Sequence, residues 1–418
     1  MKTMQTLELF AGCGGLAKGL ELAGFKHAGF LEINHQACES LRANYNPRLV
    51  HEIDVKKVDF HEFGGVDLVS GGPPCQPFSL GGLAKANNDA RDMFPQAIRA
   101  ISEIKPKGFI FENVKGLLRT KFAPYFNYII LRLSFPDCRQ KEKEKWEDHS
   151  LRLQRIKDGG RYDGLRYRVH YKLLNAADYE IPQVRERVFI VGLREDVATG
   201  WTWPQKITAR AADKIPISAV LGKVPDPQKN SHYAEDHIFI DGARVYPGHT
   251  GSDVNSPSKT IKAGAHGVPG GENMLRFADG SVRYMTVHEA KLIQTFPRDY
   301  KITGSWGEAL RQIGNAVPVQ LARYVGEHLY TLLANDPVVG RKSERMYHVS
   351  SNVALKGEQM LLAVERKKAQ MASSQKVKGL KGAVYSAGRK RSAAKKLVKV
   401  AAKKRAKPAA RRSISSKR

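Results

Sequence analysis

Residues 5–24, QTLELFAGCGGLAKGLELAG, hold an apolar run, a glycine-rich turn and a segment whose apolar residues recur three and four positions apart. The run is typical of a β-strand and the segment of an amphipathic helix. The same alternation continues to about residue 120. Further strands are expected at residues 28–33, 49–55, 66–72 and 108–114, with helices at 35–45 and 94–105.

Strands that alternate with helices predict a doubly wound, mostly parallel α/β sheet. Such sheets bind their ligands beyond the carboxyl ends of the strands. Four chemically active residues, Glu32, Asp54, Cys75 and Glu112, fall at or just after those ends. One such coincidence would mean little, whereas four together predict a cleft.

The chain of 418 residues is long enough for one large domain or two modest ones, and 42% of its residues are apolar. No continuous apolar run reaches the roughly 20 residues of a membrane-spanning helix, and the start lacks the features of a signal peptide. We therefore expect a cytoplasmic protein, nucleoid-associated in a bacterium or nuclear in a eukaryote. Four scattered cysteines without a C-x-x-C pair argue against a disulfide scaffold or a zinc site, and no metal is expected.

The positive charge is concentrated at the end of the chain. Residues 341–418 carry 24 Lys and Arg against 3 Asp and Glu, which is +21 of the total net charge of +28. This segment is too polar to build a core, so we expect a disordered tail. Nucleic acid is the natural partner of so basic a chain.

The middle of the chain differs in amino-acid composition and in periodicity from the first 120 residues. Residues 135–165 are highly charged and predict an exposed helix or insertion. Two more strands are expected at 171–183 and 187–193, joined by a turn. Residues 196–282 are rich in Gly, Pro, Ser and Lys with poor helical periodicity, which predicts a small domain of loops and short strands.

Helical patterns return at residues 286–296 and 319–333. They extend the α/β domain on the far side of the loop-rich segment. The predicted division is therefore into an α/β domain, a loop-rich domain and a basic tail. Their ranges are 1–195 with 283–335, 196–282, and 341–418.

The loop GGPPCQPFS, residues 71–79, follows an expected strand, and in it two glycines and two prolines directly precede Cys75. Its glycines allow a close approach of backbone to ligand, and its prolines restrict the loop. A free thiol has a pKa near 8.5, so a cationic neighbour such as Arg185 or Arg187 would be needed to form the thiolate. The alternative is that Cys75 is a small buried apolar residue. Gln76 and Ser79, on the same loop, are expected to contact the substrate polymer.

Glu112 ends an apolar strand in FENVKGL, residues 111–117, where partial burial favours its protonated form. Asn113 is placed either to orient that acid or to bond the neighbouring loop. The alternative is a carboxylate that satisfies backbone amides at a helix N-terminus.

The glycine-rich turn LFAGCGGL, residues 9–16, lets the chain pass close to a ligand. It lacks the G-x-x-x-x-G-K-S/T pattern of a P-loop and departs from G-x-G-x-x-G, which weakens a dinucleotide interpretation. Glu32 ends the second strand, where an acidic residue binds ribose in nucleoside-binding sheets. Asp54, after the third strand, is placed to accept an adenine amino group.

In their order, these segments resemble the cytosine-5 DNA methyltransferase family over about residues 5–330. Residues 10–15, FAGCGG, resemble its cofactor loop. Residues 73–76, PPCQ, resemble its nucleophile loop, and residues 112–114, ENV, its base-binding acid. The resemblance implies the fold of S-adenosylmethionine-dependent methyltransferases with a smaller target-recognition domain.

Three later segments continue the match. Residues 183–187, QVRER, resemble the family's basic strand-turn element, which implies that Arg187 holds the carbonyl of the base and Arg185 supports the cysteine loop. Residues 283–297 look like the element that braces the recognition domain, and residues 312–318 like the last motif, which closes the cofactor pocket. The residues expected at S-adenosylmethionine are Phe10, Gly12, Gly14, Glu32, Ile33, Asp54, Pro74 and Asn315.

Two departures from the family pattern lie outside the bond-making residues. Ile33 stands where an aromatic residue often stacks on adenine, so apolar contact would replace stacking. His288 replaces an arginine that is common in the bracing element, which leaves the contacts of that element open.

The chemistry of the chain suits methylation of cytosine. Thiolate addition at carbon 6 makes carbon 5 nucleophilic if an acid stabilises the charge at ring nitrogen 3, and covalent catalysis divides one difficult step into easier ones. Cys75, Glu112 and the cationic pair Arg185 and Arg187 supply these groups. The resemblance implies that the cytosine lies flipped out of a specific sequence in double-stranded DNA, and that the protein acts as a monomer with a possible cognate restriction endonuclease.

Two other functions compete with this one. A transfer-RNA cytosine-5 methyltransferase shares the catalytic motifs, but its Cys-Phe-Thr element is not visible in residues 196–282. A catalytically silent, architectural DNA-binding protein would suit the tail, but it has no use for Cys75, Glu112 and Arg187 together.

Sequence recognition is assigned to the loop-rich segment because no other part of the chain is free for it. Its best candidate for base reading is residues 256–273, SPSKTIKAGAHGVPGGEN, where glycines allow close approach to a groove. Lys259, Thr260, Lys262 and His266 are the expected DNA contacts. The alternative is a glycine-rich surface loop without a role in binding.

Overall fold

The computed structural model describes residues 3–74, 92–197, 200–230, 232–247, 249–263 and 273–334. Four predicted site residues, Cys75, Gln76, Ser79 and His266, lie outside the described residues, as does the predicted tail.

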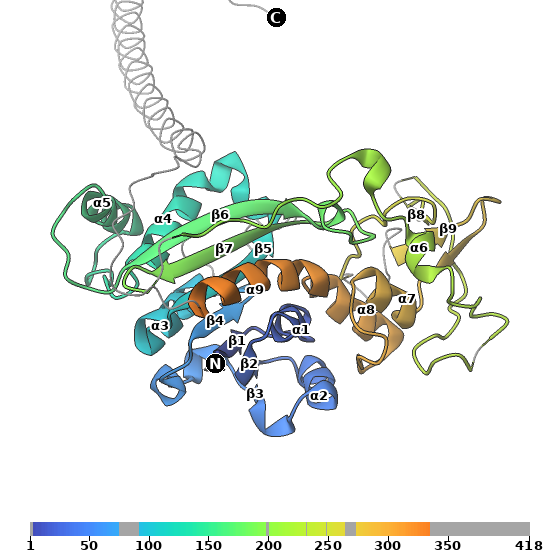
Figure 1. The fold of residues 1–418 in the computed structure, drawn as a ribbon, viewed down its shortest axis with the longest axis horizontal. Helices are drawn as coiled ribbons and strands as arrows, with labels where there is room; N and C mark the ends of the chain where they lie inside the picture. The colour runs from blue at the N-terminus through green and yellow to red at the C-terminus, as the bar shows by residue number, and fades with distance from the viewer. Residues whose placement is uncertain are drawn as a thin grey trace, which may run out of the picture. The chain divides into compact units, whose positions relative to one another are not determined.

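A seven-stranded sheet forms the centre of the fold, with strand order β3-β2-β1-β4-β5-β7-β6 (Figure 1). β1 to β5 run parallel to one another, whereas β7 is antiparallel to both β5 and β6. The predicted mostly parallel α/β fold is therefore confirmed. The strands span Gln5–Leu9 (β1), Lys26–Glu32 (β2), Val50–Glu52 (β3), Leu68–Gly71 (β4), Gly108–Val114 (β5), Tyr167–Asn175 (β6) and Glu186–Arg194 (β7).

The strand order reverses between β1 and β4. The chain moves outward from β1 to β2 and β3, then returns to the other side of β1 with β4 and β5. The loops after β1 and β4 therefore diverge to opposite faces of the sheet, and ligands of such sheets bind in the crevice that this opens.

Helices cover both faces of the sheet, so its strands are apolar on both sides. On β7, Val188 and Ile190 join the core beneath α3 (Phe94–Ile104) and α4 (Ala123–Ser134). Phe189, Val191 and Leu193, which alternate with them, join the core beneath α1 (Gly15–Leu22) and α9 (Val319–Ala334). Figure 1 shows α9, in orange, lying alongside the N-terminal α1 although the two are about 300 residues apart in sequence.

Small residues allow α1 and α9 to approach closely. A Cβ added at Gly19 would lie 2.4 Å from the Cβ of Ala322 and 2.6 Å from the carbonyl oxygen of Val319. Gly19 therefore fixes how the last helix of the α/β domain seats against the helix that follows the first strand.

The charged segment expected as an exposed helix contains α5 (Trp146–Lys157), which packs on α4 through a buried inner face. His149 is fully buried, and its Nδ1 lies 2.8 Å from the Tyr128 hydroxyl while its Nε2 lies 3.0 Å from the Cys138 carbonyl oxygen. Burial lowers the pKa of His149 to about 4, so this histidine is a neutral packing residue.

β6 differs from the expected strand over 171–183. It begins at Tyr167 and ends at Asn175, where the side chain of Asn175 accepts a hydrogen bond from the amide of Ala177 and caps a short 3₁₀ helix. Residues beyond this cap form the turn into β7. The 3₁₀ helices of the described residues include Pro47–Leu49, Val55–Lys57, Phe60–Phe63, Lys115–Leu118, Thr120–Phe122, Ala176–Asp178 and Ala211–Asp213.

A second core lies beside the main sheet. It joins α6 (Ile217–Leu221) with α7 (Val287–Ile293) and α8 (Trp306–Asn315), and it is edged by a sheet of order β10-β9-β8. The short strands span Ser252–Asp253 (β8), Met274–Arg276 (β9) and Val282–Tyr284 (β10). Residues from the loop-rich segment and from the helices after it thus share one core, and the boundary at residue 283 stays a prediction.

α2 (His35–Asn44) packs beside β2 and β3. None of the helices in the part of the chain that the structure describes is long and apolar enough to cross a membrane.

Candidate active site

A cleft of about 650 Å³ lies at the carboxyl ends of the parallel strands. The loops after β1, β2, β3 and β4, the end of β5 and the C-terminal end of α8 line it. It therefore occupies the crevice expected at the reversal of strand order. Its walls include seven of the eight residues predicted to contact the cofactor: Phe10, Gly12, Glu32, Ile33, Asp54, Pro74 and Asn315.

The turn after β1 is held in left-handed backbone conformations. Phe10 and Gly12 both have φ of 54°, and Gly14 has φ of 85°. Phe10 is strained there, since a residue with a Cβ is disfavoured in this region by about 1–2 kcal/mol, and such strain is typical of functional sites. A Cβ added at Gly12 would meet no described atom within 4 Å, so this glycine borders open space in the cleft.

Gly14, the eighth predicted residue, is buried beneath the loop and does not line the cleft. It is the N-cap of α1, and a Cβ there would lie 2.5 Å from the Tyr300 hydroxyl. That hydroxyl donates a hydrogen bond of 2.7 Å to the carbonyl of Cys13. Tyr300 thus supports the turn from below, and Gly14 is required for this contact.

The Glu32 carboxylate organises the centre of the cleft through backbone amides. Its Oε2 accepts a hydrogen bond from the Gly12 amide at 2.7 Å. Its Oε1 accepts from the amides of Ile33 and Asn34 at 2.9 and 2.8 Å. Since a carboxylate has about four acceptor positions, one position on Oε2 is left for a hydroxyl donor from a ligand.

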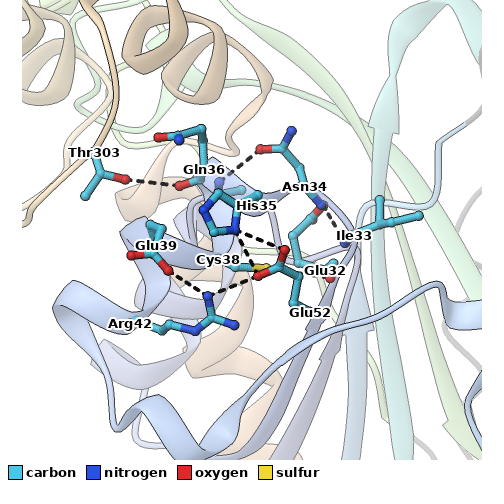
Figure 2. A network of polar contacts seen from close by, with 11 residues as sticks. Glu32, Ile33, Asn34, His35, Gln36, Cys38, Glu39, Arg42, Glu52 and Thr303 are labelled. Carbon is cyan, nitrogen blue, oxygen red and sulfur yellow. Dashed lines mark hydrogen bonds and ion pairs between the residues drawn. The ribbon is translucent and has the colours of Figure 1, made fainter.

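The outer end of the cleft is apolar and is backed by an ion network. Ile33 is 67% exposed, and Figure 2 shows it directed away from the polar side chains around it. Behind it, Glu52 Oε1 lies 3.0 Å from His35 Nδ1, and Glu52 Oε2 accepts from Arg42 at 3.1 Å (Figure 2). This network ties α2 to β3. Asp54, two residues beyond Glu52, accepts the Lys56 amide on Oδ1.

Glu112 lies on the inner wall, where the antiparallel register brings the end of β5 beside the start of β7. Arg187 Nε is 2.8 Å from Glu112 Oε1, and both side chains are nearly buried. Burial raises the pKa of Glu112, although the charges of Arg187 and Arg185 oppose that shift. The ion pair is close but not aligned as a hydrogen bond, so Oε1 has no hydrogen-bond partner among the described residues.

Asn113 bonds the neighbouring loop, one of the two roles expected for it. Its Nδ2 donates a hydrogen bond of 2.9 Å to the carbonyl of Pro73, and its Oδ1 accepts from the Val114 amide. The strand that carries Glu112 is therefore fastened to the loop two residues before Cys75. Pro74, which lies between Pro73 and Cys75 in the sequence, lines the cleft.

Arg185 is fully buried and does not line the cleft. Its Nη1 donates to the carbonyl of Ile261 at 3.0 Å, and its Nη2 donates to the carbonyls of Gly314 and Ala316 at 2.6 and 2.9 Å. These contacts join two distant segments of backbone. Support of the cysteine loop by Arg185 stays a prediction, because Cys75 lies outside the described residues.

The described part of the predicted base-reading stretch runs beside the turn that carries Arg185. Lys259 Nζ donates to the Thr250 hydroxyl at 2.7 Å, and the Thr260 hydroxyl donates to the carbonyl of Val184 at 2.7 Å. The backbone amide and carbonyl of Lys262 both bond the Asn273 side chain. The stretch is thus anchored next to the turn that carries Arg185, and its contact with DNA stays a prediction.

Two side chains of the bracing element, Arg283 and His288, have charged partners, and of these only His288 departs from the family pattern. Arg283 pairs with Glu289, whose side chain completes a capping box with Thr286 at the start of α7. His288 Nδ1 lies 2.9 Å from Asp236 Oδ1, and Lys291 Nζ lies 2.6 Å from Asp236 Oδ2. The histidine therefore connects α7 to the loop-rich segment in place of an arginine.

Glu8 lines the cleft but is not among the residues predicted from the sequence. It lies on β1, is 1% exposed, and accepts a hydrogen bond from the Ser70 hydroxyl on β4. Burial raises the pKa of Glu8 to about 8 against the opposing effect of Ser70. The available signal was one acidic residue inside the otherwise apolar run TLELF.

One group of described side chains has the spacing of a metal site: Asp59, His61 and Glu103, each offering a ligand atom within 4.8 Å of the others. Two of the three are exposed, and the group lies away from the cleft. Asp59 already accepts the His61 amide, and Glu103 pairs with Arg99.

The chain is similar in sequence and in fold to known methyltransferases. The family model for C-5 cytosine-specific DNA methylases matches residues 4–136 and 147–331. Type II methyltransferase M.NgoMIV of Neisseria gonorrhoeae is 32% identical over 79% of this chain and 98% of its own length. Type II methyltransferase M.PspPI of a Psychrobacter species is 34% identical over 80% of this chain and 81% of its own. The crystal structure of the S. pombe Dnmt2 methyltransferase has the same fold, with a TM-score of 0.54 at 18% identity, covering 78% of this chain and 98% of that one.

Proposed function

The chain belongs to the C-5 cytosine-specific DNA methylase family and is a DNA cytosine-5 methyltransferase, and from this we propose how it works. It transfers the methyl group of S-adenosylmethionine to carbon 5 of a cytosine that has left a specific double-stranded DNA sequence. Cys75 forms a temporary covalent bond to the base. The observation that carries the proposal is the buried pair of Glu112 and Arg187, fastened through Asn113 to the loop that leads into Cys75.

The cleft has hydrogen-bond acceptors and apolar surfaces that fit S-adenosylmethionine. The free acceptor position on Glu32 fits a ribose hydroxyl, and Asp54 fits the adenine amino group beside the exposed side chain of Ile33. The rest of the cofactor would lie between the turn at Phe10 and Gly12 and the residue Asn315, all of which line the cleft. When bound, the cofactor supplies an electrophilic methyl group on a sulfonium.

Glu112 and Arg187 recognise and activate the base. Burial raises the pKa of Glu112 and so favours uptake of a proton, and in its protonated form the carboxyl group donates that proton toward ring nitrogen 3. Arg187 supports the carbonyl at position 2, as in the family, and limits how far the pKa of Glu112 rises. The oxygen of Glu112 without a hydrogen-bond partner among the described residues is then satisfied by the base.

The reaction proceeds in three changes at the base. The Cys75 thiolate forms a bond to carbon 6, and the ring electrons move toward nitrogen 3, where Glu112 supplies the proton. With S-adenosylmethionine held beside Glu32 and Asp54, carbon 5 would take its methyl group and S-adenosylhomocysteine would leave. Transfer of the proton from carbon 5 to water restores the double bond between carbons 5 and 6 and expels the Cys75 thiolate, and nitrogen 3 returns its proton to Glu112.

Target recognition is assigned to the loop-rich segment, with Lys259, Thr260, Lys262 and His266 as its DNA contacts. Since the curated relatives are type II methyltransferases, we propose that the protein protects DNA within a restriction–modification system and has a cognate endonuclease. We expect it to act as a monomer, since residues of a single chain line the described part of the cleft.

Bisulfite sequencing of DNA from cells that express the protein tests this function and finds the recognition sequence. We expect one short sequence motif to be protected from conversion, and Cys75→Ser to abolish that protection. Incubation of purified protein with labelled S-adenosylmethionine and either duplex DNA or transfer RNA distinguishes the transfer-RNA alternative. Label in transfer RNA alone would overturn the proposal.

A further inference from the structure

Three fully buried polar side chains connect the base-reading stretch to the wall of the cleft. They are Gln183 and Arg185, on the turn before β7, and Gln294, directly after α7. A buried polar group is stabilising only when it is bonded, so the partners of these three residues show which segments the fold holds together.

Both backbone groups of Ile261 are held from the turn before β7. The Ile261 amide donates to Gln183 Oε1 at 3.2 Å, and its carbonyl accepts from Arg185 Nη1 at 3.0 Å. Thr260 adds a hydrogen bond from its hydroxyl to the carbonyl of Val184. The stretch that contains Lys259 and Lys262 therefore has its position set by Gln183 and Arg185.

Arg185 also binds the last turn of α8 directly, and Gln183 is connected to it through Gln294. Arg185 Nη2 binds the carbonyls of Gly314 and Ala316. Gln183 Nε2 donates to Gln294 Oε1 at 2.5 Å, and Gln294 Nε2 donates to the carbonyls of Ile313 and Ala316 at 3.0 and 2.7 Å. Carbonyls at a helix C-terminus lack partners within the helix and carry partial negative charge, so a buried guanidinium is well placed there.

The two segments also touch directly. A Cβ added at Gly314 would lie 2.4 Å from the backbone nitrogen of Ala263 and 2.5 Å from the carbonyl carbon of Lys262. Asn315, Ala316 and Val317, which follow Gly314, line the cleft. A shift of the stretch therefore moves the cleft wall unless the network between them is broken.

We propose that Arg185, with Gln183, is a positioning residue that couples DNA binding to cofactor binding. This inference rests on the proposed function, since it takes the cleft as the cofactor site and residues 259–262 as DNA contacts. Each ligand orders one side of the network and thereby the other, so the second ligand to bind orders less of the protein. Thermodynamic linkage requires that each ligand tighten the other by the same factor.

Arginine is required for this role because one guanidinium binds carbonyls of two segments at once. A lysine ammonium is a compact charge on a flexible stem and does not present the same planar set of donors. Arg185→Lys therefore keeps the charge beside Glu112 but loses the bridge. Gln183→Met, which removes the acceptor for the Ile261 amide and leaves Arg185 in place, is a second, milder break.

The test is a titration of S-adenosylhomocysteine by calorimetry, with and without a duplex that carries the sequence found by bisulfite sequencing. In the unaltered protein we expect the duplex to tighten binding of S-adenosylhomocysteine by about 5-fold or more, within the usual range of coupling between sites. The ratio of the two dissociation constants should fall to near 1 in Arg185→Lys and partway in Gln183→Met. Tyr128→Phe removes a buried hydrogen bond between α4 and α5 instead, and it should keep the ratio of the unaltered protein.

The outcomes separate the coupling from the function. A ratio near 1 in the unaltered protein, or an unchanged ratio in Gln183→Met or in a folded Arg185→Lys, overturns the coupling while leaving the methyltransferase assignment intact. Equal loss of coupling in Tyr128→Phe would show that general destabilisation is responsible and also overturns it. Failure of the unaltered protein to bind S-adenosylhomocysteine at all would instead contradict the proposed function.

Discussion

Replacement of Glu112 by glutamine tests whether this residue supplies a proton or only a hydrogen bond. Glutamine has nearly the same shape and can donate to ring nitrogen 3, but it cannot release a proton to it. The change also removes the negative charge that lies 2.8 Å from Arg187 Nε. It therefore has a catalytic and a structural consequence, and their sizes must be compared.

The catalytic effect is expected to be measurable in folded protein. General acid–base groups contribute about 10²–10⁴-fold in rate, which is about 2.7–5.4 kcal/mol in activation free energy. Breaking a buried ion pair destabilises by about 3–5 kcal/mol, and we expect the low end because Glu112 borders an open cleft. A domain stable by about 5–15 kcal/mol remains folded after such a loss.

The assay is single-turnover methylation of the duplex at saturating cofactor, with circular dichroism to verify folding. Glu186→Gln is the matched control: the same chemical change one residue before Arg187, in a surface pair with Lys115 that does not line the cleft. That variant should methylate at the unaltered rate. Rates within a few-fold of each other for Glu112→Gln and the unaltered protein would refute a proton-donating role for Glu112.

Three further predictions address the cleft and the tail. Burial raises the pKa of Glu8 from 4.5 to about 8, so the stability that protonated Glu8 contributes is fully present below the ordinary value and is lost as the pH rises through about 8. Glu8→Gln should remove this loss, which is worth up to about 5 kcal/mol. Urea unfolding at pH 5 and pH 8 checks this, and an equal change in stability with pH in both proteins would contradict it. Ile33→Trp should tighten S-adenosylhomocysteine binding about 2- to 10-fold through stacking worth about 0.5–1.5 kcal/mol, and calorimetry showing equal or weaker binding would exclude an adenine beside Ile33. Deleting residues 341–418 should lower the log–log salt slope on non-cognate duplex by about 0.9 for each phosphate contact removed, whereas an inert tail leaves the slope unchanged.

The sequence predicted the sheet and the walls of the cleft because both depend on local order along the chain. Glu32, Asp54, Pro74 and Glu112 end or follow strands, and the carboxyl ends of parallel strands meet at one edge of a sheet. Their convergence in one cleft needed no knowledge of tertiary contacts. The alternating apolar pattern of β7 likewise follows from burial on both faces.

What the sequence could not predict depends on contacts between distant segments. The partners of Arg185 are backbone carbonyls 76 and more residues away, and a carbonyl has no sequence signature. Tyr300 supports the turn at Cys13 from 287 residues away for the same reason. Gly14 was expected to face the cofactor because it belongs to the glycine-rich turn, but its φ angle and the Tyr300 hydroxyl explain it instead.

The covalent bond between Cys75 and the base is the central claim, and trapping it tests the account most directly. A duplex carrying 5-fluorocytosine at the target position has no proton to lose from carbon 5, so the enzyme should remain bound after methyl transfer. Intact mass spectrometry should find the protein joined to the duplex, with the bond mapped to Cys75 and absent from Cys75→Ser. Full turnover without an adduct, or an adduct that persists in Cys75→Ser, would contradict the mechanism.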